Sequence, residues 1–504
     1  MSLDVLPARG LSPRDRPRTL PDAHERLRVL GERVRSDLDI LRYPSDDWVM
    51  PRAHSSGAHV YDVVIVGAGQ GGLATAFALQ REKVSNVLII DQSPKGHEGP
   101  WVTYSKMWTL RSPKHLTGPD LGIPSLTPRA YFEARYGESA FQALGKWPRT
   151  IWQDYLNWYR EVLNLPVENR TALKTIEPDP YGLKLTLADC DTGGLRTVYC
   201  RKLVLATGLE GMGGWYVPPM MKALPKERWS MCTDSVGSDV FEGRSIAILG
   251  AGATAWDRAA DLLEHGARAV TIYMRRPEIL KANPFRYMEK AGYLRHYAEM
   301  DDGRKWRWMR SIFRFGQPPT QDGVDRCAAF DNFTLHAGTS WAETHVTDEG
   351  VCVTGTDGSR CTFDHLFVGC GFSVDPANRP ELAPFAHQIA RWRDKFALPK
   401  EDKDNPLADY PYLDDTLAFT ERTPGEAPFL KNIRCFNYGA TMSNAHSGAS
   451  LSGMKYGIGP LIAGITRDFW NDDELAHFRI IDTWAEVDTD PAALSGQIVR
   501  RNGD

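Results

Sequence analysis

Residues 61–91 read YDVVIVGAGQGGLATAFALQREKVSNVLIID, and this stretch decides the fold. Two short apolar runs, at 63–66 and 87–90, are typical of strands that are buried on both faces. The first run ends in the glycine-rich turn GAGQGG, a helical pattern follows, and the second run ends in Asp91. Strand, GxGxxG turn, helix, strand and terminal acid in this order predict a βαβ unit that binds a dinucleotide.

The residues of this turn have separate physical roles in such a site. Gly67 permits the tight turn, Gly69 lets the backbone approach a pyrophosphate, and Gly72 lets the helix pack closely on the strand. The N-terminus of the helix offers free N–H groups and a partial positive charge to the phosphates. Asp91 is placed to accept hydrogen bonds from a ribose. The predicted dinucleotide contacts of the first motif are Gly67, Ala68, Gly69, Gln70, Gly72 and Asp91.

The same pattern returns in the middle of the chain. A strand leads into GAGATA at 250–255, a helix follows, and the next strand ends in Arg275 and Arg276 instead of an acid. Alanine in place of the third glycine and a basic pair favour the 2′-phosphate of NADPH, because guanidinium groups bind phosphate bidentately. A second NADH site with solvated arginines is the alternative. The predicted contacts here are Gly250, Gly252, Ala253, Thr254, Ala255, Arg275 and Arg276.

Outside the two motifs, the spacing of apolar residues predicts helices at 22–41, 150–163 and 449–467 and hairpins at 182–200 and 350–363. Each hairpin leads into a buried strand that ends in small residues, first Ala206-Thr207-Gly208 and then Gly369-Cys370-Gly371. Residues 275–314 mix Lys and Arg with aromatic residues. We expect a solvated helical cap there, with one or two cations turned into the site; nucleic-acid binding is the alternative for such a mixture.

Composition and charge exclude several classes of protein. The 504-residue chain has a net charge of −4 at pH 7, so no global field draws it to nucleic acid or to an anionic membrane. No apolar run approaches the roughly 18 residues of a membrane span, and the N-terminus has no apolar core of the signal-peptide type. The chain has eight cysteines, and no two of them form a CxxC pair. The sequence therefore predicts neither a disulfide framework nor a metal site. We expect a cytoplasmic protein, for which a homodimer is one option.

Two nucleotide folds, the second inserted between the halves of the first, resemble the two-dinucleotide-domain flavoproteins and, within them, the class B flavin-dependent monooxygenases. The match spans residues 60–468 and rests on both glycine motifs, on Gly99-Pro100-Trp101, which looks like the family's GxW, and on the two small-residue strand ends. The resemblance implies an α/β fold of two Rossmann-like domains, with the NADPH domain inserted into the FAD domain. The implied parts are an arm and helix at 1–59, the FAD domain at 60–210 and 365–470, the NADPH domain with its helical insertion at 211–364, and a tail at 471–504.

The resemblance also implies cofactors and a reaction. FAD would occupy the first motif and NADPH the second, and a C4a-(hydro)peroxyflavin would transfer one atom of O₂ to a small organic substrate. N- or S-oxygenation is the favoured reaction, and Baeyer–Villiger oxygenation of a carbonyl is the alternative. An alternative of another class is a non-oxygenating NADPH–flavin redox or sensor protein. A disulfide reductase would need two cysteines a few residues apart beside the flavin, and no such pair is present.

Two positions depart from the family pattern. The FxGxxxH fingerprint is absent before the second glycine motif, and Arg111 takes the slot in which flavin-containing monooxygenases carry an Asn beside the flavin. Arg111 would either stabilise a developing peroxide anion or bind a phosphate, and His446 is a candidate acid–base group. The loop and helix at 437–453 would lie under the flavin ring. The remaining predicted cofactor contacts are Trp101, His115, Ala206, Thr207, Gly208, Gly371 and Ser443.

Overall fold

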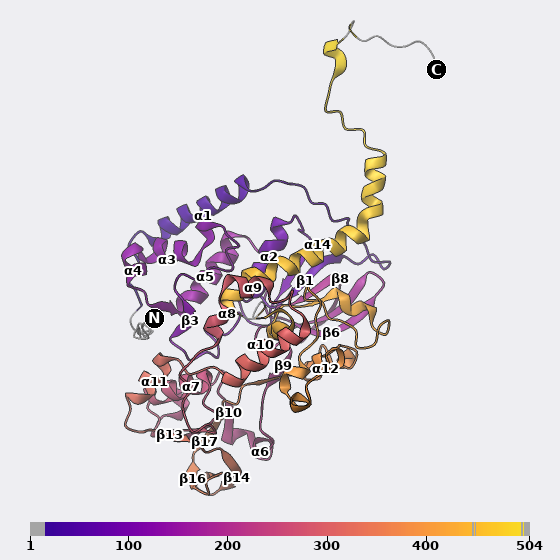
Figure 1. The fold of residues 1–504 in the computed structure, drawn as a ribbon. Helices are drawn as coiled ribbons and strands as arrows, with labels where there is room; N and C mark the ends of the chain where they lie inside the picture. Colours follow the sequence, from indigo (N-terminus) through magenta and orange to yellow (C-terminus); the bar gives the residue numbers. More distant parts are fainter. Residues whose placement is uncertain (1–15, 446–447, 449, 495–496, 498–504) are drawn as a thin grey trace.

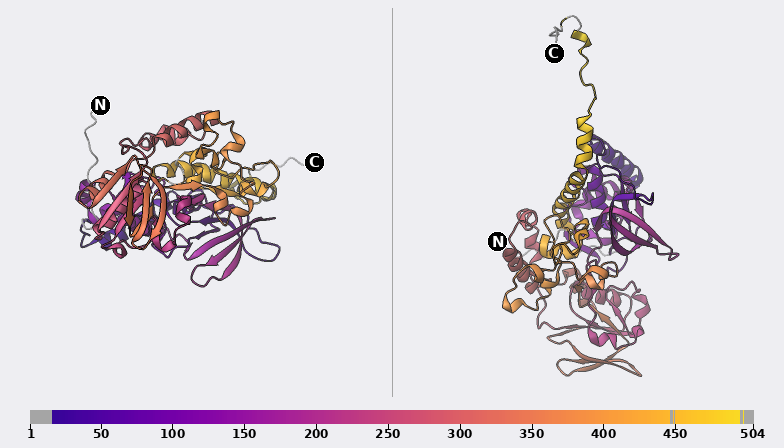
Figure 2. Two further views of the ribbon diagram at one scale, coloured as in Figure 1. Left: turned by 90° about the horizontal axis from the view of Figure 1, so that it is seen from below. Right: turned by 90° about the vertical axis from the view of Figure 1, so that its right-hand side faces the viewer.

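A computed structural model describes residues 16–445, 448, 450–494 and 497 of the chain. The chain forms two large sheets, each built around one of the glycine-rich turns, with helices packed on them (Figure 1). Smaller ribbons and short helices fill the space between and beside the sheets. Figure 2 shows the two halves of the molecule from below and from the side.

The first sheet is centred on β1 (Val60–Val66), which leads into the first turn and helix α2 (Gln70–Arg81). β1 pairs in parallel with β2 and with β8, and its residues 63–65 are completely buried, as predicted for a strand covered on both faces. The strand order is β5-β2-β1-β8-β7-β6, and β19 also pairs with β8. The bounds are β2 Val87–Ile90, β5 Val167–Glu168, β6 Thr171–Asp179, β7 Gly182–Asp189, β8 Leu195–Leu205 and β19 Ile433–Cys435.

The second sheet is parallel, in the order β10-β17-β11-β12-β13. β11 (Ser245–Leu249) leads into the second turn and helix α7 (Ala253–Glu264), which repeats the first motif. Because β17 pairs with β11, this sheet continues past residue 364, the predicted end of the NADPH domain. The other bounds are β10 Trp229–Met231, β12 Ala269–Met274, β13 Phe333–Ala337 and β17 His365–Val368.

Different elements cover the two faces of the second sheet. Helix α7 and helix α11 (Gln321–Ala328) pack on one face in a core that contains Trp256 and Cys327. An antiparallel sheet packs on the other face in a core that contains Tyr273 and Trp341. Its strands are β14 Trp341–Thr347, β15 Gly350–Gly355 and β16 Arg360–Phe363, and the last two form the predicted hairpin.

The chain crosses between the two large sheets twice. It leaves the first sheet after β8 and returns to it at β19, so the second sheet is an insertion in the first domain. The crossings pair with each other as the antiparallel ribbon of β9 (Gly213–Trp215) and β18 (Phe372–Val374). This connectivity confirms the predicted fold class, two Rossmann-like domains with the second inserted into the first.

Helices at the N-terminal side cover the first domain. The predicted helices there are confirmed as α1 (Ala23–Ile40) and α5 (Arg149–Val162), and α1 packs beside α3 (Pro128–Tyr136). The long segment between β2 and α5 also contains the short antiparallel pair β3 (Thr109–Pro113) and β4 (Lys146–Pro148). Shorter helices are α4 Glu138–Ala143, α6 Pro219–Lys222, α12 Trp392–Lys395 and α13 Thr441–Asn444.

The helical insertion is largely exposed, as predicted for a solvated cap, but it does not contact the second domain alone. Its helices are α8 (Phe285–Met288), α9 (Ala291–His296) and α10 (Asp302–Phe315). Two buried side chains join it to the segment that follows β18: the Tyr297 hydroxyl donates to the carbonyl of Met442 (3.0 Å), and Trp306 Nε1 donates to Asp402 (2.9 Å). The insertion therefore bridges the two domains.

The last helix is longer than predicted. Helix α14 runs from Leu451 to Asp482 with Pro460 inside it, whereas the apolar pattern suggested an end at 467 and a tail from 471. No glycine or proline interrupts residues 466–482, so nothing in the sequence stops the helix there. Its C-terminal part leaves the body of the molecule (Figures 1 and 2).

Candidate dinucleotide sites and the interface between them

The first glycine turn lies at the carboxyl edge of the first sheet, between β1 and α2. Gly67 has φ +101°, and a Cβ there would lie 2.5 Å from the carbonyl oxygen of Ala206. A Cβ on Gly72 would clash with the carbonyl oxygen of Gly67. Only glycine fits these two positions. The predicted roles of Gly67 in the turn and of Gly72 in helix packing therefore have a direct steric cause.

Gly69 has open space in front of it. The nearest heavy atom to a Cβ built on Gly69 is the Cα of Gly99, 4.0 Å away, and a Cβ on Gly208 would have no heavy atom within 4 Å. Gly69 is also the residue that precedes the first turn of α2, where N–H groups are free. The space beside Gly69 and the free N–H groups at the start of α2 provide the room and the donors that a pyrophosphate needs, so the residues present fit FAD.

The polar side chains of the first motif already have partners within the protein. The carboxylate of Asp91, at the end of β2, accepts hydrogen bonds from the N–H groups of Ala68 (2.8 Å) and Ser93 (2.7 Å). Gln70 accepts one from Trp152 Nε1 (3.2 Å). A carboxylate oxygen accepts more than one hydrogen bond, so a ribose contact of Asp91 stays a prediction.

Asn437, the first residue of the loop predicted to lie under the flavin ring, holds the end of β8, although no role was predicted for its own side chain. Its side chain is 1% exposed and donates to Thr207 Oγ1 (3.1 Å), while the N–H of Tyr438 donates to the carbonyl of Gly208 (3.1 Å). The N–H of Ala206 donates to Val66 (2.9 Å). These contacts bring the predicted residues 206–208 to the same sheet edge as the first turn. An isolated Asn after a strand gave no motif by which to find it.

Several other predicted residues are not gathered at this edge. The Ser443 hydroxyl is 3% exposed, accepts from Trp392 Nε1 (3.2 Å) and Leu413 N (3.1 Å), and donates to Pro411 (3.3 Å). The hydroxyl therefore has a structural role and no hydrogen-bonding capacity left for a ligand. His115 is exposed, with its ring edge-on to Phe141.

Trp101 is buried against Trp152, with ring centroids 6.4 Å apart, so it contributes to the packing of the first domain. Its contact with the flavin cofactor stays a prediction. His446, the second predicted catalytic residue, lies outside the described residues.

The second turn reproduces the first one with one exchange. Gly250 has φ +99°, and a Cβ there would lie 2.5 Å from the carbonyl oxygen of Gly369, just as Gly67 faces Ala206. Ala255 replaces the third glycine, and its Cβ fits because the facing residue is Gly369, where a Cβ would lie only 2.9 Å away. Built Cβ atoms on Gly252 and Gly371 would have no heavy atom within 4 Å. The residues of this turn also leave room for a dinucleotide, and Ala253 and Thr254 begin helix α7 beside it.

Arg275 and Arg276 follow β12 at the edge where the second turn lies. The N–H of Gly250 donates to the carbonyl of Tyr273 (3.0 Å), which fixes the turn beside the end of β12. Both arginines are exposed, and Arg276 donates to the carbonyl of Phe315 (3.1 Å). Their position suits recognition of a 2′-phosphate, which stays a prediction.

Arg275→Ala should weaken NADPH binding more than Arg276→Ala does, because the Arg276 guanidinium is partly engaged by Phe315. Loss of one charge-assisted contact costs about 1.5–3 kcal/mol, roughly ten- to a hundredfold in affinity. NADH binding should hardly change. Titration with each coenzyme measures the two affinities. The control is Arg268→Ala, because Arg268 is an exposed arginine just before the first residue of β12, at the opposite end of the strand from Arg275. Equal losses for NADPH and NADH would contradict 2′-phosphate recognition.

A polar network joins the two domains along residues 106–111. Thr109 Oγ1 donates to Asp322 on α11 (2.8 Å), and Arg111 Nη2 donates to the carbonyl of Pro318 (2.6 Å). Arg326 on α11 donates to the carbonyl of Lys106 (3.1 Å). Three residues of the first domain thus contact α11 or the loop before it, which fixes the orientation of one domain against the other.

Arg326 is the centre of this network. Its side chain is 4% exposed, makes two 2.8 Å hydrogen bonds to the carboxylate of Glu264 and lies over the ring of Trp108, 4.5 Å from its centroid. Asp257 on α7 lies 4.0 Å from it. Burial raises the pKa of Asp257 to about 6, against the opposing effects of Arg326 and Arg111.

The structure therefore places Arg111 in a half-buried position between the domains. Burial lowers its pKa, the nearby carboxylate of Asp257 raises it, and the charge of Arg286 lowers it. Its guanidinium has five donors, of which the described residues engage one, at Pro318. Whether the others serve the substrate or a phosphate stays a prediction.

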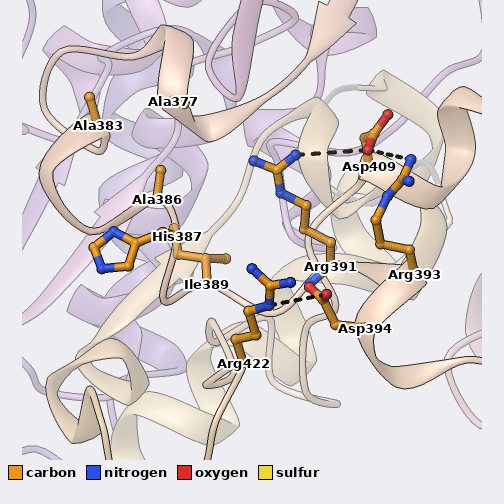
Figure 3. Close-up of a pocket in the computed structure, with 10 residues that line it drawn as sticks. All are labelled: Ala377, Ala383, Ala386, His387, Ile389, Arg391, Arg393, Asp394, Asp409 and Arg422. Atoms are coloured by element: carbon orange, nitrogen blue, oxygen red, sulfur yellow. Dashed lines mark hydrogen bonds and ion pairs between the residues drawn. The ribbon is translucent and has the colours of Figure 1, made fainter.

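A separate cavity of about 480 Å³ lies in the segment between β18 and β19 (Figure 3). Arg391, Arg393 and Arg422 line it, and each is paired with a carboxylate: Asp409 lies 3.8 Å from Arg391 and 2.6 Å from Arg393, and Asp394 lies 3.2 Å from Arg422. Neither glycine turn contributes to its lining. The paired charges favour a structural role for this cluster.

Within the described residues, no helix is both long and apolar enough to cross a membrane. The same residues contain no group of three or more His, Cys, Asp or Glu side chains that could hold a metal ion.

Comparison with known proteins agrees with this geometry. A family model described as pyridine nucleotide-disulphide oxidoreductase matches residues 61–312. The chain is 41% identical over 453 residues to the FAD-dependent urate hydroxylase of Xanthomonas campestris pv. campestris, a match that covers 89% of this chain and 94% of that protein.

Solved structures share the fold at low identity. The ornithine hydroxylase of Pseudomonas aeruginosa has a TM-score of 0.63 at 16% identity, over 81% of this chain and 99% of that one. The L-lysine 6-monooxygenase of Pseudomonas syringae has a TM-score of 0.61 at 16% identity, over the same shares of the two chains. The chain belongs to the pyridine nucleotide-disulphide oxidoreductase family, is related along most of its length to a FAD-dependent hydroxylase, and has the fold of the class B flavin-dependent monooxygenases.

Proposed function

We propose that this monooxygenase hydroxylates urate or a closely related oxidised purine. The observation that carries the proposal is the 41% identity to a urate hydroxylase over 94% of that protein's length. Identity at this level spans both glycine motifs and the segments between them, so the resemblance is not confined to cofactor binding.

Aromatic side chains beside the ribbon of β9 and β18 support a planar substrate. Neighbouring rings meet nearly edge to face: Tyr104 and Trp215 at 6.0 Å, Trp215 and Phe372 at 5.9 Å, and Phe372 and Tyr438 at 4.4 Å between centroids. Aromatic faces and edges of this kind hold a flat heterocycle by stacking. The row lies beside both predicted cofactor edges. The N–H of Tyr438 donates to the carbonyl of Gly208, and the N–H of Tyr216, the residue after Trp215, donates to the carbonyl of Gly371.

Arg111 supports an anionic substrate. Urate carries a negative charge at neutral pH, and a guanidinium keeps its positive charge at any working pH and binds oxyanions in a planar fork. When bound, FAD supplies the activation of O₂. The chain's own residues bind and orient the substrate and keep water out. Urate has no ring C–H bond, so in the balanced reaction one oxygen atom of O₂ adds as a hydroxyl group to a carbon of the ring-fusion C=C bond, a ring N–H loses its proton and the double bond shifts to C=N. The second oxygen atom leaves as water, and NADPH supplies the two electrons.

N- or S-oxygenation, which the sequence analysis favoured, remains the second candidate. The ornithine and lysine hydroxylases share the fold, but at 16% identity they carry no argument about the substrate. Baeyer–Villiger oxygenation has no observation in its favour beyond family membership. A non-oxygenating NADPH–flavin protein would consume NADPH without forming an oxygenated product.

A substrate screen tests the proposal. NADPH oxidation, O₂ uptake, H₂O₂ and product would be measured with urate, xanthine, ornithine, lysine, a thioether and a cyclic ketone. We expect urate to accelerate NADPH oxidation and to give close to one hydroxylated product per NADPH. If urate releases only H₂O₂ while an amine yields a hydroxylamine, the second candidate is correct.

Arg111→Met should lower kcat/KM for urate about ten- to a hundredfold, because a charge-assisted contact contributes about 1.5–3 kcal/mol. FAD content should not change, and anaerobic bleaching of the flavin by NADPH should stay within a few-fold of the wild-type rate. Arg111→Lys should restore only part of the activity, since lysine lacks the planar fork. The control is Arg129→Met, which removes an exposed arginine of the first domain. Slower bleaching with unchanged product per NADPH would instead assign Arg111 to a phosphate of NADPH.

A further inference from the structure

Tyr438 contacts both predicted cofactor edges. Its N–H donates to the carbonyl of Gly208 (3.1 Å), at the edge where the first glycine turn lies. Its ring packs nearly edge to face on Phe372, with 4.4 Å between centroids, and Phe372 directly follows Gly371 at the edge of the second turn. A Cβ built on either glycine would have no heavy atom within 4 Å, so both edges are open. The side chain of Tyr438 therefore adjoins the space in which the two cofactors and the substrate would meet.

The backbone of Tyr438 is held on both sides. Asn437, just before it, donates to Thr207 Oγ1 (3.1 Å), and the Asn437 side-chain oxygen accepts from the N–H of Gly439 (2.8 Å), just after it. A Cβ on Gly439 would lie 2.7 Å from Met212 Cγ, so the chain that follows Tyr438 packs tightly on Met212. A side chain binds a ligand best when the structure around it fixes its position in advance. The surroundings of Tyr438 meet this condition.

The half-buried side chain of Tyr438 has a hydroxyl proton to donate. Burial raises the pKa of Tyr438 to about 12, so the proton stays on at any working pH, although a hydrogen bond with the Tyr410 hydroxyl lowers that pKa. Burial, the charge of Tyr438 and the same hydrogen bond raise the pKa of Tyr410, which identifies Tyr410 as the donor of the pair. Among the described residues, no acceptor is present for the Tyr438 proton itself. A donor in this situation requires a ligand or water as its partner.

We propose that the Tyr438 hydroxyl donates a hydrogen bond to a carbonyl oxygen of urate, and that Tyr410 holds this hydroxyl in the required orientation. This role of Tyr438 rests on the proposed function and adds a residue to the same site. Tyr438 is then a substrate-binding residue. Tyr410 is a positioning residue, since it is 5% exposed and its ring centroid lies 6.0 Å from that of Tyr438.

The chemistry of urate fits a donor at this place. Urate is a flat ring system that aromatic side chains can hold, and its carbonyl oxygens lie around the rim in the plane of the rings. Aromatic contacts fix the plane of such a molecule but not its rotation within that plane, which polar contacts at the rim must set. The Tyr438 hydroxyl is the polar tip of one ring in the aromatic row and can supply such a contact. An alkylammonium group offers only donors and could not use it.

Tyr438→Phe tests the contact, because it keeps the ring that packs on Phe372 and removes only the hydroxyl. Urate would be titrated into the full-length holoenzyme with flavin absorbance as the readout, and kcat and KM would be measured. We expect urate affinity to fall about tenfold, with KM raised to match, while FAD content, NADPH affinity and anaerobic flavin reduction stay unchanged. The matched control is Tyr136→Phe, which removes the hydroxyl of a buried tyrosine on α3 and should bind urate as the wild type does.

Tyr410→Phe leaves the Tyr438 hydroxyl in place and should weaken urate binding by a smaller factor. A larger loss than in Tyr438→Phe would assign the contact to Tyr410 and overturn the proposal. Full urate affinity in folded Tyr438→Phe would overturn it as well and leave the proposed function intact. Unchanged urate affinity with weaker NADPH binding or slower flavin reduction would show that the hydroxyl serves a cofactor instead. A wild type that forms no hydroxylated product from urate would overturn both the proposed function and this role of Tyr438.

Discussion

Gly69→Asp is expected to give colourless protein that folds but holds almost no FAD. A Cβ at Gly69 meets no heavy atom closer than 4.0 Å, and the residue has an ordinary negative φ of −68°, so the fold accommodates a side chain. The new carboxylate would face the pyrophosphate at the N-terminus of α2. Two like charges about 4 Å apart near a protein surface repel by about 4 kcal/mol, roughly a thousandfold in affinity.

The matched control is Gly69→Asn, which has the same shape without the charge. FAD released by denaturation and measured per chain should be near one for the wild type, clearly retained in Gly69→Asn and below roughly a tenth in Gly69→Asp. Thermal unfolding and circular dichroism establish that both variants are folded. Stoichiometric FAD in folded Gly69→Asp would show that the pyrophosphate does not lie at this turn.

Local sequence patterns predicted the two nucleotide folds because, in each, the strand, the glycine turn, the helix and the next strand follow one another in a single continuous stretch. Gly67 and Gly250 each face the carbonyl of a residue at the end of a neighbouring strand, and neither tolerates a Cβ. The strands on either side are continuous apolar runs, as parallel strands must be. The extent of the last helix was missed because residues 470–482 are helical without an apolar face that is covered by the body.

The boundary at residue 364 could not be read from the chain. β17 resembles β8 in sequence, since both are apolar and end in small residues, yet β8 belongs to the first sheet and β17 to the second. Their partners are set by topology, because β17 pairs with strands more than a hundred residues earlier. A hydrophobic run predicts a buried strand but does not identify its neighbours.

The interface network was missed because its members are far apart in the sequence. Thr109 and Asp322 are separated by 213 residues, and Lys106 and Arg326 by 220. No spacing rule joins such residues, and each alone is typical of a solvated surface. Arg111 was singled out only because it occupies a known slot in a family pattern, and its contact with Pro318 could not be foreseen.

Arg326→Ala should destabilise the protein by about 3–5 kcal/mol, because removing one partner of a buried ion pair leaves an uncompensated charge. The substitution would leave Glu264 without its bidentate partner, leave Asp257 with a weaker counter-charge and open a gap over Trp108. It would also break the hydrogen bond to Lys106, so the two domains would be held less firmly. Thermal unfolding, followed by release of FAD fluorescence, should therefore begin at a clearly lower temperature.

Two further variants separate stability from domain orientation. Arg304→Ala removes an exposed arginine that pairs with Asp301 at the surface, and it should change the free energy of unfolding by less than about 1 kcal/mol. Thr109→Val keeps the shape of the side chain but removes the 2.8 Å hydrogen bond to Asp322 across the interface. If the network sets the approach of NADPH to FAD, Thr109→Val should slow anaerobic flavin reduction several-fold with little loss of stability. An unchanged reduction rate in Thr109→Val, together with a large loss of stability in Arg326→Ala, would mean that the network only stabilises the fold.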